Sequence, residues 1–600
     1  MNCSARAVDE EFLDERCPAN VALQSRPVAT LVACAAILLL PLFRCSAPAQ
    51  QAGTQPAPIV RTEDGGLRGQ MRGNLAVFQG IPFAAPPVGK LRWREPKPVA
   101  PWSGVRDATR PGSACVQSAA GLNPFIAPLA AAYGAPYTVH PIASSEDCLY
   151  LNVWVPEWPP KAAQPAPGLP APALPVMVWL HGGSNTAGSG AQSTYDGASL
   201  ATRGVILITV NYRLGVMGFF SHPELAAESP HHTSGNYGLQ DQLAALLWVR
   251  QNIAAFGGDA SNVTLFGESA GSIDAGMLLA SPQSTGLFRR VILESGPPFG
   301  LGTPRTRSEA EAVGASIAKA APGGSASTLE NLRRMPAAQV VELAASVEKA
   351  QFKGFDPNSP TIDGWLLTQA PARTFATAAM QKAEVMVGLN GRELSAFRVA
   401  AAAAPKTSGK PMPAAGAGDA LRGVANTTRP LYGNWTGVAI AAYLGAAVVY
   451  HGAAIDQATN DMLMACPIGA LGALTSAAGQ HAYIYQFDRS IPGKGQPELG
   501  AFHGLEVLFV FNAFDDPAWR WLPFTAADRQ LSNVMENYWT NFAKTGNPNA
   551  AGLPMWDAWN ENDEPYMEFA ANATAVPRRS FAPPFCHLSS ERIRSQLTKN

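Results

Sequence analysis

The chain has 600 residues, of which 47% are hydrophobic and 15% charged, and its 44 Lys and Arg nearly balance 45 Asp and Glu. This is a globular composition without a basic surplus, so we expect no nucleic-acid partner. Such a length exceeds what one ordinary core fills, but large α/β enzymes accommodate it through insertions, so length alone leaves the number of domains open.

An uncharged apolar run near the N-terminus predicts an export signal. Residues 28–43 read VATLVACAAILLLPLF, and Ala47-Pro48-Ala49 follows as an A-x-A-like cleavage signal. We expect residues 1–49 to be a signal peptide and the mature protein to be secreted or periplasmic, with no stable membrane span. Acidic residues precede the run, which indicates that the true start lies downstream. An uncleaved anchor is the alternative, although the run is short for a membrane helix of about 20 residues.

Further along the chain, apolar runs alternate with longer helix-compatible segments. Runs rich in Val, Ile and Leu predict buried strands at 176–180, 205–210, 263–266, 291–293, 385–389 and 483–487. Between them lie segments such as 239–256, LQDQLAALLWVRQNIAAF, which predicts a helix. This alternation is typical of an α/β fold whose mostly parallel sheet is covered by helices on both faces.

Two segments of low complexity predict loop insertions. Residues 156–175 are rich in Pro and Ala, and residues 400–418 are similarly loose in composition. Neither has the length or the flanking context of a domain boundary. We therefore expect residues 50–600 to form a single domain.

The stretch VTLFGESAGS at 263–272 places a serine between two glycines at the end of a predicted strand. Gly267-Glu268-Ser269-Ala270-Gly271 fits the pattern G-x-S-x-G and precedes a helix-compatible segment, SIDAGMLLA. A sharp strand-to-helix turn of this kind presents the hydroxyl at a helix start, whose dipole favours negative charge, and leaves no room for a side chain at either glycine. A Gly-rich turn that merely contains serine is the weaker alternative. Ser269 is therefore the candidate nucleophile.

A nucleophilic serine also requires a base and preset donors for the acyl oxygen. The loop His181-Gly182-Gly183-Ser184 follows the strand predicted at 176–180. Its exposed amides, together with that of Ala270, are candidate oxyanion donors, and a plain Gly-rich strand exit is the alternative. We expect a structural role for His181.

Together with these motifs, four long stretches resemble the type-B carboxylesterase family, which includes cholinesterases and the non-enzymatic neuroligins. They are FQGIPFAAPPVGKLRWREP (78–96), SEDCLYLNVWVP (145–156), the segment from Gly235 to Ser272, and TNFAKTGNPN (540–549). The resemblance covers residues 59–587 and implies the α/β-hydrolase fold with large loop insertions. It also implies hydrolysis of small-molecule carboxylic esters through an acyl-enzyme, with no metal or organic cofactor.

The resemblance implies the other members of a catalytic triad. The family's acid lies in a segment G-x-N-x-x-E-x-x-x-F, matched by GLNGRELSAF at 388–397, and its base lies in H-G-x-E, matched by HGLE at 503–506. Glu393 and His503 therefore join Ser269, and Gly183, Ser184 and Ala270 supply the oxyanion hole. The ordinary imidazole pKa of about 6.5 then predicts loss of activity between about pH 6 and 7 as His503 takes up a proton.

Four of the eight cysteines lie in the expected mature chain, which permits three pairings. The resemblance implies that Cys115 pairs with Cys148, as in the family's first disulfide, and that Cys466 pairs with Cys586, as in some members. Each would stabilise the fold by about 2 to 4 kcal/mol, mainly by restricting the unfolded chain.

Two departures from the family pattern bear on the substrate. Ser184 stands where the family usually has a third glycine, and its side chain could narrow the acyl site. No tryptophan occurs at 116–147, where cholinesterases hold a quaternary ammonium, so we do not expect choline esters. The alternatives are a hydrolase of amides, carbamates or lipid esters and, more remotely because the triad is retained, a neuroligin-like binding module. The pattern selects neither one natural ester nor an oligomeric state.

Overall fold

The structure is a computed structural model that describes residues 56–138, 143–160, 173–300, 302–322, 328–351, 359–403, 457, 459–583 and 586. The expected signal peptide, residues 1–49, lies outside the described residues. The described residues belong to one compact unit, Pro56–Asn600. Within these ranges no helix is long and apolar enough to cross a membrane.

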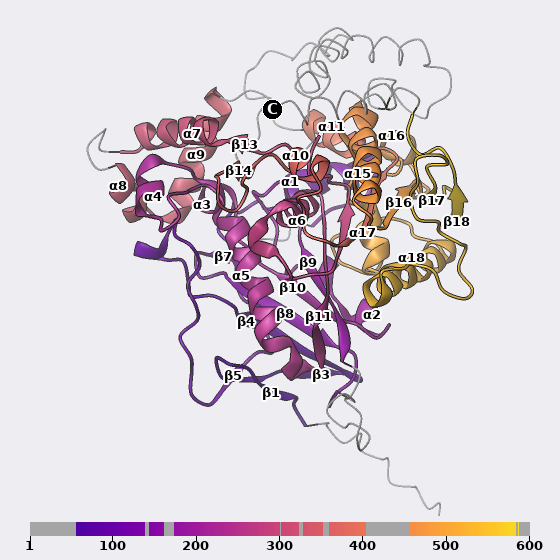
Figure 1. The fold of residues 1–600 in the computed structure, drawn as a ribbon, viewed down its shortest axis with the longest axis horizontal. Coiled ribbons are helices and arrows are strands. Elements are labelled where there is room, and N and C mark those ends of the chain that lie inside the picture. Colours follow the sequence, from indigo (N-terminus) through magenta and orange to yellow (C-terminus); the bar gives the residue numbers. More distant parts are fainter. Residues whose placement is uncertain are drawn as a thin grey trace, which may run out of the picture. The chain divides into compact units, whose positions relative to one another are not determined.

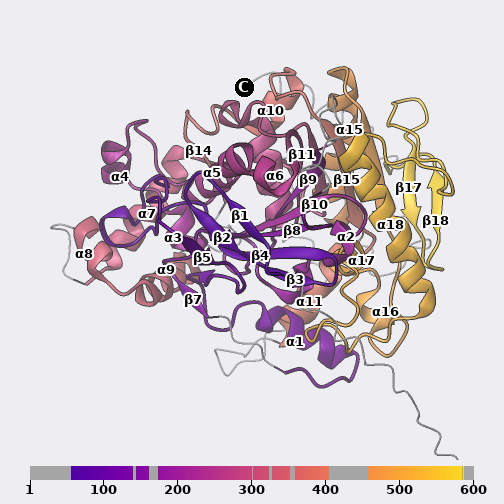
Figure 2. The same ribbon diagram turned by 90° about the horizontal axis from the view of Figure 1, so that it is seen from below.

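One large sheet of 11 strands organises the fold (Figures 1 and 2). All neighbours from β17 to β10 pair parallel. Antiparallel pairs extend the sheet with β18 at one edge and with β8, β4 and β3 at the other. In spatial order the strands are β18 (Ala575–Arg578), β17 (Tyr566–Phe569), β16 (Ala482–Phe487), β15 (Glu384–Asn390), β12 (Arg290–Glu294), β11 (Gly258–Glu268), β9 (Leu174–Leu180), β10 (Ile206–Val210), β8 (Tyr150–Val155), β4 (Leu75–Pro82) and β3 (Gln70–Arg72).

The six strands predicted from apolar runs are confirmed as β9, β10, β11, β12, β15 and β16. They occupy the centre of the sheet, where successive residues are buried whichever face they point to. A strand covered on both faces has no polar alternation, which is why these segments are continuous apolar runs in the sequence. The short edge strands β3 and β18 carry no such run. Three small sheets lie outside this one, formed by β1 (Ile59–Arg61), β2 (Gly66–Arg68) and β5 (Val105–Asp107), by β6 (Ala114–Cys115) and β7 (Ser144–Ser145), and by β13 (Arg305–Thr306) and β14 (Thr361–Ile362).

Helices cover both faces of the sheet. Along β9, Val176, Val178 and Leu180 belong to one hydrophobic cluster, whereas Met177 and Trp179 belong to another. The first cluster includes residues of α5 (Tyr237–Asn252), α6 (Ala270–Ala280), α10 (Pro371–Ala376) and α15 (Cys466–Ala477). The second includes residues of α2 (Ala198–Ala201), α11 (Glu393–Ala403), α17 (Leu505–Val510) and α18 (Ala526–Thr545).

A third hydrophobic cluster holds the helices grouped to one side in both views (Figures 1 and 2). They are α3 (Gly215–Phe219), α4 (Pro223–Glu228), α7 (Arg307–Ala320), α8 (Thr328–Arg334) and α9 (Ala337–Gln351). Two further helices, α1 (Asn123–Ala132) and α16 (Gln496–Leu499), each pack against α11.

Both predicted loop insertions are partly wrong at their ends. Leu174 and Pro175 already belong to β9. Pro175 precedes the pairing of β9 with β10 and falls at the register shift in its pairing with β11, so its missing amide costs no ladder hydrogen bond. Residues 400–403 continue α11, because alanine is a strong helix former even in a segment of low complexity. Residues 161–172 and 404–418 lie outside the described part of the chain.

Both expected disulfides are formed. Cys115 pairs with Cys148 and closes a loop of 33 positions that carries α1. Cys466, the first residue of α15, pairs with Cys586.

Candidate active site

Ser269 lies at the turn between β11 and α6. Its backbone has φ 55° and ψ -122°, a conformation that residues with a side chain rarely adopt. The Ser269 amide donates to the Glu294 carbonyl at 2.9 Å, and the Ser269 carbonyl accepts from the Ile273 amide at 2.9 Å. The turn is thus held at both ends while the hydroxyl faces a cavity at the start of α6.

The two glycines of the G-x-S-x-G motif are required by close backbone approaches. A Cβ at Gly271 would lie 2.1 Å from the Leu180 carbonyl oxygen, and one at Gly267 would lie 2.6 Å from the Gly271 carbonyl carbon. A third glycine was not predicted. A Cβ at Gly296 would lie 2.3 Å from the Ser269 carbonyl oxygen.

Glu393 and His503 meet beside Ser269, although 110 positions separate them in the chain. Glu393 is the first residue of α11 and is fully buried, and its Oε1 accepts the Asn390 amide at 2.7 Å. His503 lies just before α17, and its Nδ1 lies 2.5 Å from Glu393 Oε2. A carboxylate in this position selects the tautomer with hydrogen on Nδ1 and leaves Nε2 to act as a base.

Glu268, the residue before Ser269, lies on the other side of the imidazole. Its Oε1 is 3.1 Å from His503 Nε2, within ion-pair distance but without hydrogen-bond alignment. Within the described part of the chain, Ser269 makes no side-chain hydrogen bond with His503. In enzymes without bound substrate, the hydrogen bond between the catalytic serine and histidine is often long or poorly aligned, and it tightens when the substrate binds.

The carboxylates around the imidazole set its proton affinity. Burial lowers the pKa of His503, but Glu268 and Glu393 outweigh burial and raise it to about 9. Burial raises the pKa of Glu268 to about 7, with His503 opposing and Glu393 adding to this change. His503 therefore holds a proton more tightly than an ordinary histidine.

The loop after β9 brings Gly183 and Ser184 to the same cavity as Ser269. Both have positive φ, 110° at Gly183 and 55° at Ser184. No described residue accepts a hydrogen bond from the amides of Gly183, Ser184 or Ala270. Unpaired amides beside a serine hydroxyl are the arrangement that an oxyanion requires.

The adjacent His181 has the structural role expected for it. It is 1% exposed, its Nδ1 lies 2.8 Å from the Gly182 carbonyl oxygen, and its ring stacks on Tyr212 at 4.4 Å. Burial lowers its pKa to about 4, so His181 stays neutral at ordinary pH.

The cavity that contains Ser269 and His503 has a volume of about 230 Å³. Its walls are mainly apolar, with Leu122 and Phe125 from the disulfide loop and Phe397 from α11. Phe397 packs on the His503 ring at 5.0 Å and on Phe125 at 5.2 Å. Such a space suits a small uncharged molecule better than a macromolecule.

The sequence did not predict Glu268, Thr194 and Tyr195 as part of this site. Glu268 has a signal in the sequence, because it ends the buried half of β11, where a carboxylate needs partners that compensate for its burial. Thr194 and Tyr195 lie in a 3-10 turn a short distance after the oxyanion loop, but they match no motif, so only the structure shows that they line the cavity.

Comparison with known sequences shows the family. The profile of the carboxylesterase family matches residues 56–585. A fumonisin B1 esterase of Sphingopyxis macrogoltabida is 41% identical over 345 residues, which span 57% of this chain and 57% of that relative. A pyrethroid hydrolase of Rattus norvegicus is 33% identical over 549 residues, 88% of each chain.

Solved structures agree over nearly the whole fold. A thermophilic PNB esterase superposes with a TM-score of 0.71 at 30% identity, covering 90% of this chain and all of that one. A carboxylesterase of Geobacillus stearothermophilus gives the same TM-score and identity and covers 90% of this chain and 99% of its own. The predicted α/β-hydrolase fold is confirmed, and the chain belongs to the carboxylesterase family.

Proposed function

We propose that this chain hydrolyses carboxylic esters through a covalent acyl-enzyme, with Ser269 as nucleophile, His503 as base and Glu393 as acid. The observation that carries the proposal is the convergence of three separate segments. A strained serine turn, an imidazole bonded to a buried carboxylate and unpaired loop amides all lie at one cavity. Each component is required for acyl transfer by serine.

In the first step Ser269 Oγ attacks the ester carbonyl while His503 Nε2 takes the hydroxyl proton. Glu393 holds the imidazole by Nδ1 and stabilises its charged form. The amides of Gly183, Ser184 and Ala270 receive the oxyanion, each contributing about 3 kcal/mol in the transition state. The tetrahedral intermediate then expels the alcohol, whose oxygen takes the proton from Nε2. Water repeats the attack on the acyl-enzyme and releases the acid.

The alternatives to ester hydrolysis remain amides, carbamates or lipid esters, which the same triad can support. The proteins compared above are described as esterases or as a pyrethroid hydrolase, which favours esters. A non-catalytic binding module would not need a strained serine turn or a buried His–Glu pair.

We also propose that the mature protein is exported and acts as a single catalytic domain. Two disulfides within the described residues support an oxidising compartment, where such bonds persist. The apolar run at 28–43 followed by Ala47-Pro48-Ala49 supports cleavage of a signal peptide.

Hydrolysis of p-nitrophenyl acetate, butyrate and laurate by the mature chain, beside Ser269→Ala, tests the function. We expect turnover of at least one short ester by the parent and a loss of about 10⁶ in kcat in the variant, as for other triad serines. An anilide of the best acid serves as the amide probe. Equal rates of parent and variant would contradict the proposal, and faster turnover of the anilide would favour the amidase alternative.

A further inference from the structure

The cavity beside Ser269 is lined by residues of two chemical kinds. Leu122, Phe125, Phe397 and Trp519 form part of an apolar wall. Polar residues also line the cavity, among them Gln192, Thr194, Tyr195 and Glu268, which we call the polar wall. The first three of these lie on the same segment as the oxyanion loop, separated from Ser184 by residues 185–191, so one segment builds both features.

The polar wall presents hydrogen-bonding groups that have no protein partner. Thr194 and Tyr195 are each 7% exposed, yet neither hydroxyl makes a hydrogen bond with a described residue. Gln192 uses Oε1 to accept the Ser189 amide at 3.0 Å, and its Nε2 has no partner in the described ranges. Thr194 and Tyr195 are nearly buried, and polar side chains in such positions are ordinarily paired, so their hydroxyls fit a ligand that supplies the missing partners. Gln192 is half-buried and adds an amide donor at the same cavity.

Within the polar wall, Tyr195 is held firmly in place. The Tyr195 ring packs on Trp179 at 5.1 Å and on Phe511 at 5.5 Å, which fixes the position of its hydroxyl. A fixed donor and acceptor loses little conformational freedom when it binds a ligand, so it selects among ligands more sharply than a mobile one.

The reaction places the alcohol half of the ester at this wall. The leaving oxygen takes its proton from His503 Nε2, so it must lie within hydrogen-bond reach of that atom. Nε2 lies 3.1 Å from Glu268 Oε1, so the leaving oxygen lies beside Glu268, which is itself part of the polar wall. Burial and then Glu268 raise the pKa of Tyr195, which places Tyr195 near the same carboxylate. The atoms that follow the leaving oxygen therefore enter the part of the cavity that the polar wall lines.

We infer that the enzyme prefers esters whose alcohol carries further hydroxyl groups, that is, esters of polyols. The hydroxyls bond to Thr194, Tyr195 and Gln192, while the carbon skeleton of the alcohol packs on the apolar wall. This inference rests on the proposed esterase function and adds the class of alcohol. The products are the free acid and the polyol, with water as the second reactant.

The test compares glycerol 1-monobutyrate with propyl butyrate. Both esters form the same butyryl-enzyme, so a difference in kcat/KM reports the acylation step, in which the alcohol is still bound. We expect the parent to prefer the glycerol ester by about tenfold, because hydroxyl pairing discriminates strongly when unpaired groups would otherwise remain.

Variants at the polar wall identify the groups responsible. Tyr195→Phe and Thr194→Val should each lower kcat/KM for the glycerol ester by about 5-fold to 20-fold and change that for the propyl ester by less than about twofold. Ser193→Ala removes an exposed hydroxyl from the same turn and is the matched control, expected to change neither ester. Thermal unfolding of each variant verifies that the fold is retained.

Different failures have different meanings. Equal kcat/KM for the two esters in the parent, or the same fractional loss for both in Tyr195→Phe, overturns the polyol inference and leaves the esterase function standing. A preference for butyrylcholine over glycerol monobutyrate overturns it in favour of a cationic alcohol. Absence of hydrolysis of every butyrate ester by the parent contradicts the esterase function and the inference together.

Discussion

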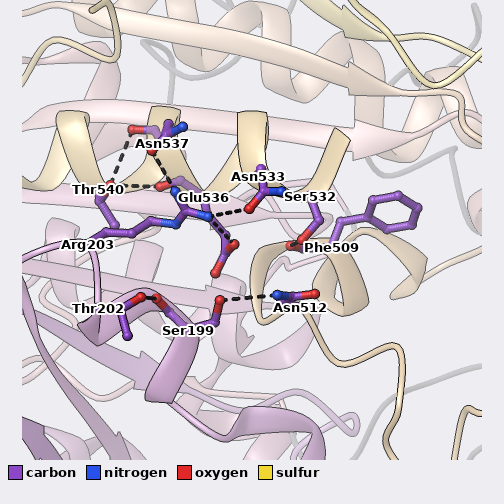
Figure 3. A network of polar contacts seen from close by, with 10 residues as sticks. All are labelled: Ser199, Thr202, Arg203, Phe509, Asn512, Ser532, Asn533, Glu536, Asn537 and Thr540. Atoms are coloured by element: carbon purple, nitrogen blue, oxygen red, sulfur yellow. Dashed lines mark hydrogen bonds and ion pairs between the residues drawn. The ribbon is translucent and has the colours of Figure 1, made fainter. Parts of the chain in front are cut away.

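Two buried carboxylates of this chain, Glu536 and Glu393, are both 0% exposed but have different partners. Glu536, on α18, accepts from Arg203 Nη2 at 2.7 Å, and the same guanidinium donates to Asn533 and Asn537 at 2.8 Å each (Figure 3). Glu393 faces His503, whose charge depends on pH. One carboxylate thus has a permanent cation beside it, and the other has a cation that the reaction creates and removes.

The surroundings of the two carboxylates reinforce this difference. Glu268 and Glu506 are also buried near His503, and Glu294 is buried near these two carboxylates. No Lys or Arg in the described ranges forms an ion pair with any of the three. Burial, then Glu268 and Glu393, raise the pKa of Glu506 to about 8. Burial also raises the pKa of Glu536, but the Arg203 hydrogen bond opposes it. A permanent cation makes a buried carboxylate part of the scaffold, whereas a cluster without one can exchange protons near neutral pH.

The two carboxylates should differ most in activity when the charge of each is removed. Glu393→Gln should lower kcat/KM for p-nitrophenyl butyrate by about 10⁴, because the amide no longer selects the Nδ1–H tautomer or stabilises the imidazolium. Glu536→Gln is the matched control and should keep kcat/KM within about twofold. A loss below about tenfold for Glu393→Gln would mean that His503 takes its orientation from another group.

The pair formed by Arg203 and Glu536 should matter for stability rather than for activity. Arg203→Met leaves Glu536 buried without its cation and should lower the free energy of unfolding by about 3 kcal/mol, measured by urea titration, with little change in kcat. The control is Arg307→Met, which removes an exposed pair with Glu311 at 2.8 Å and should cost at most about 0.5 kcal/mol. Equal losses in the two variants would contradict a structural role for the Arg203 network.

The central sheet could be predicted from the sequence because its strands are buried on both faces. A run such as the core of β9 has no other stable location than a covered strand, so composition alone indicates it. The antiparallel strands β3 and β18 are short and partly exposed, and their pairing depends on neighbours rather than on their own residues. Likewise the last turn of α11 was missed because low complexity and helix propensity make opposite predictions for an alanine run.

The candidate site likewise contains residues that the sequence indicates and residues that only the fold reveals. Ser269 has a local signal, since its turn constrains five consecutive residues. Glu393 and His503 have none of their own, and only the family pattern identified them before the fold placed them 2.5 Å apart. Tyr195 was missed because its position at the cavity follows from packing on Trp179 and Phe511, which no spacing rule describes.

The pH dependence of activity shows what the fold adds to the sequence. The ordinary imidazole pKa predicted a midpoint between about pH 6 and 7, but the surrounding carboxylates raise the pKa of His503 to about 9. Only the neutral imidazole accepts the serine proton, so kcat/KM should fall as the pH drops through this pKa, with a midpoint above the ordinary value of about 6.5.

Glu268→Gln should move this midpoint down by about one pH unit, because it removes the negative charge 3.1 Å from His503 Nε2. Glu506→Gln is the control. Glu506 bonds to Ser295 and Asn390 rather than to His503 and contributes less to raising the His503 pKa, so its shift should be in the same direction and smaller. Profiles of kcat/KM from pH 5 to 10 for a butyrate ester, corrected for spontaneous hydrolysis, measure both shifts. A parent midpoint at or below about 6.5 that Glu268→Gln leaves unchanged would mean that Glu268 carries no charge beside His503 in the free enzyme.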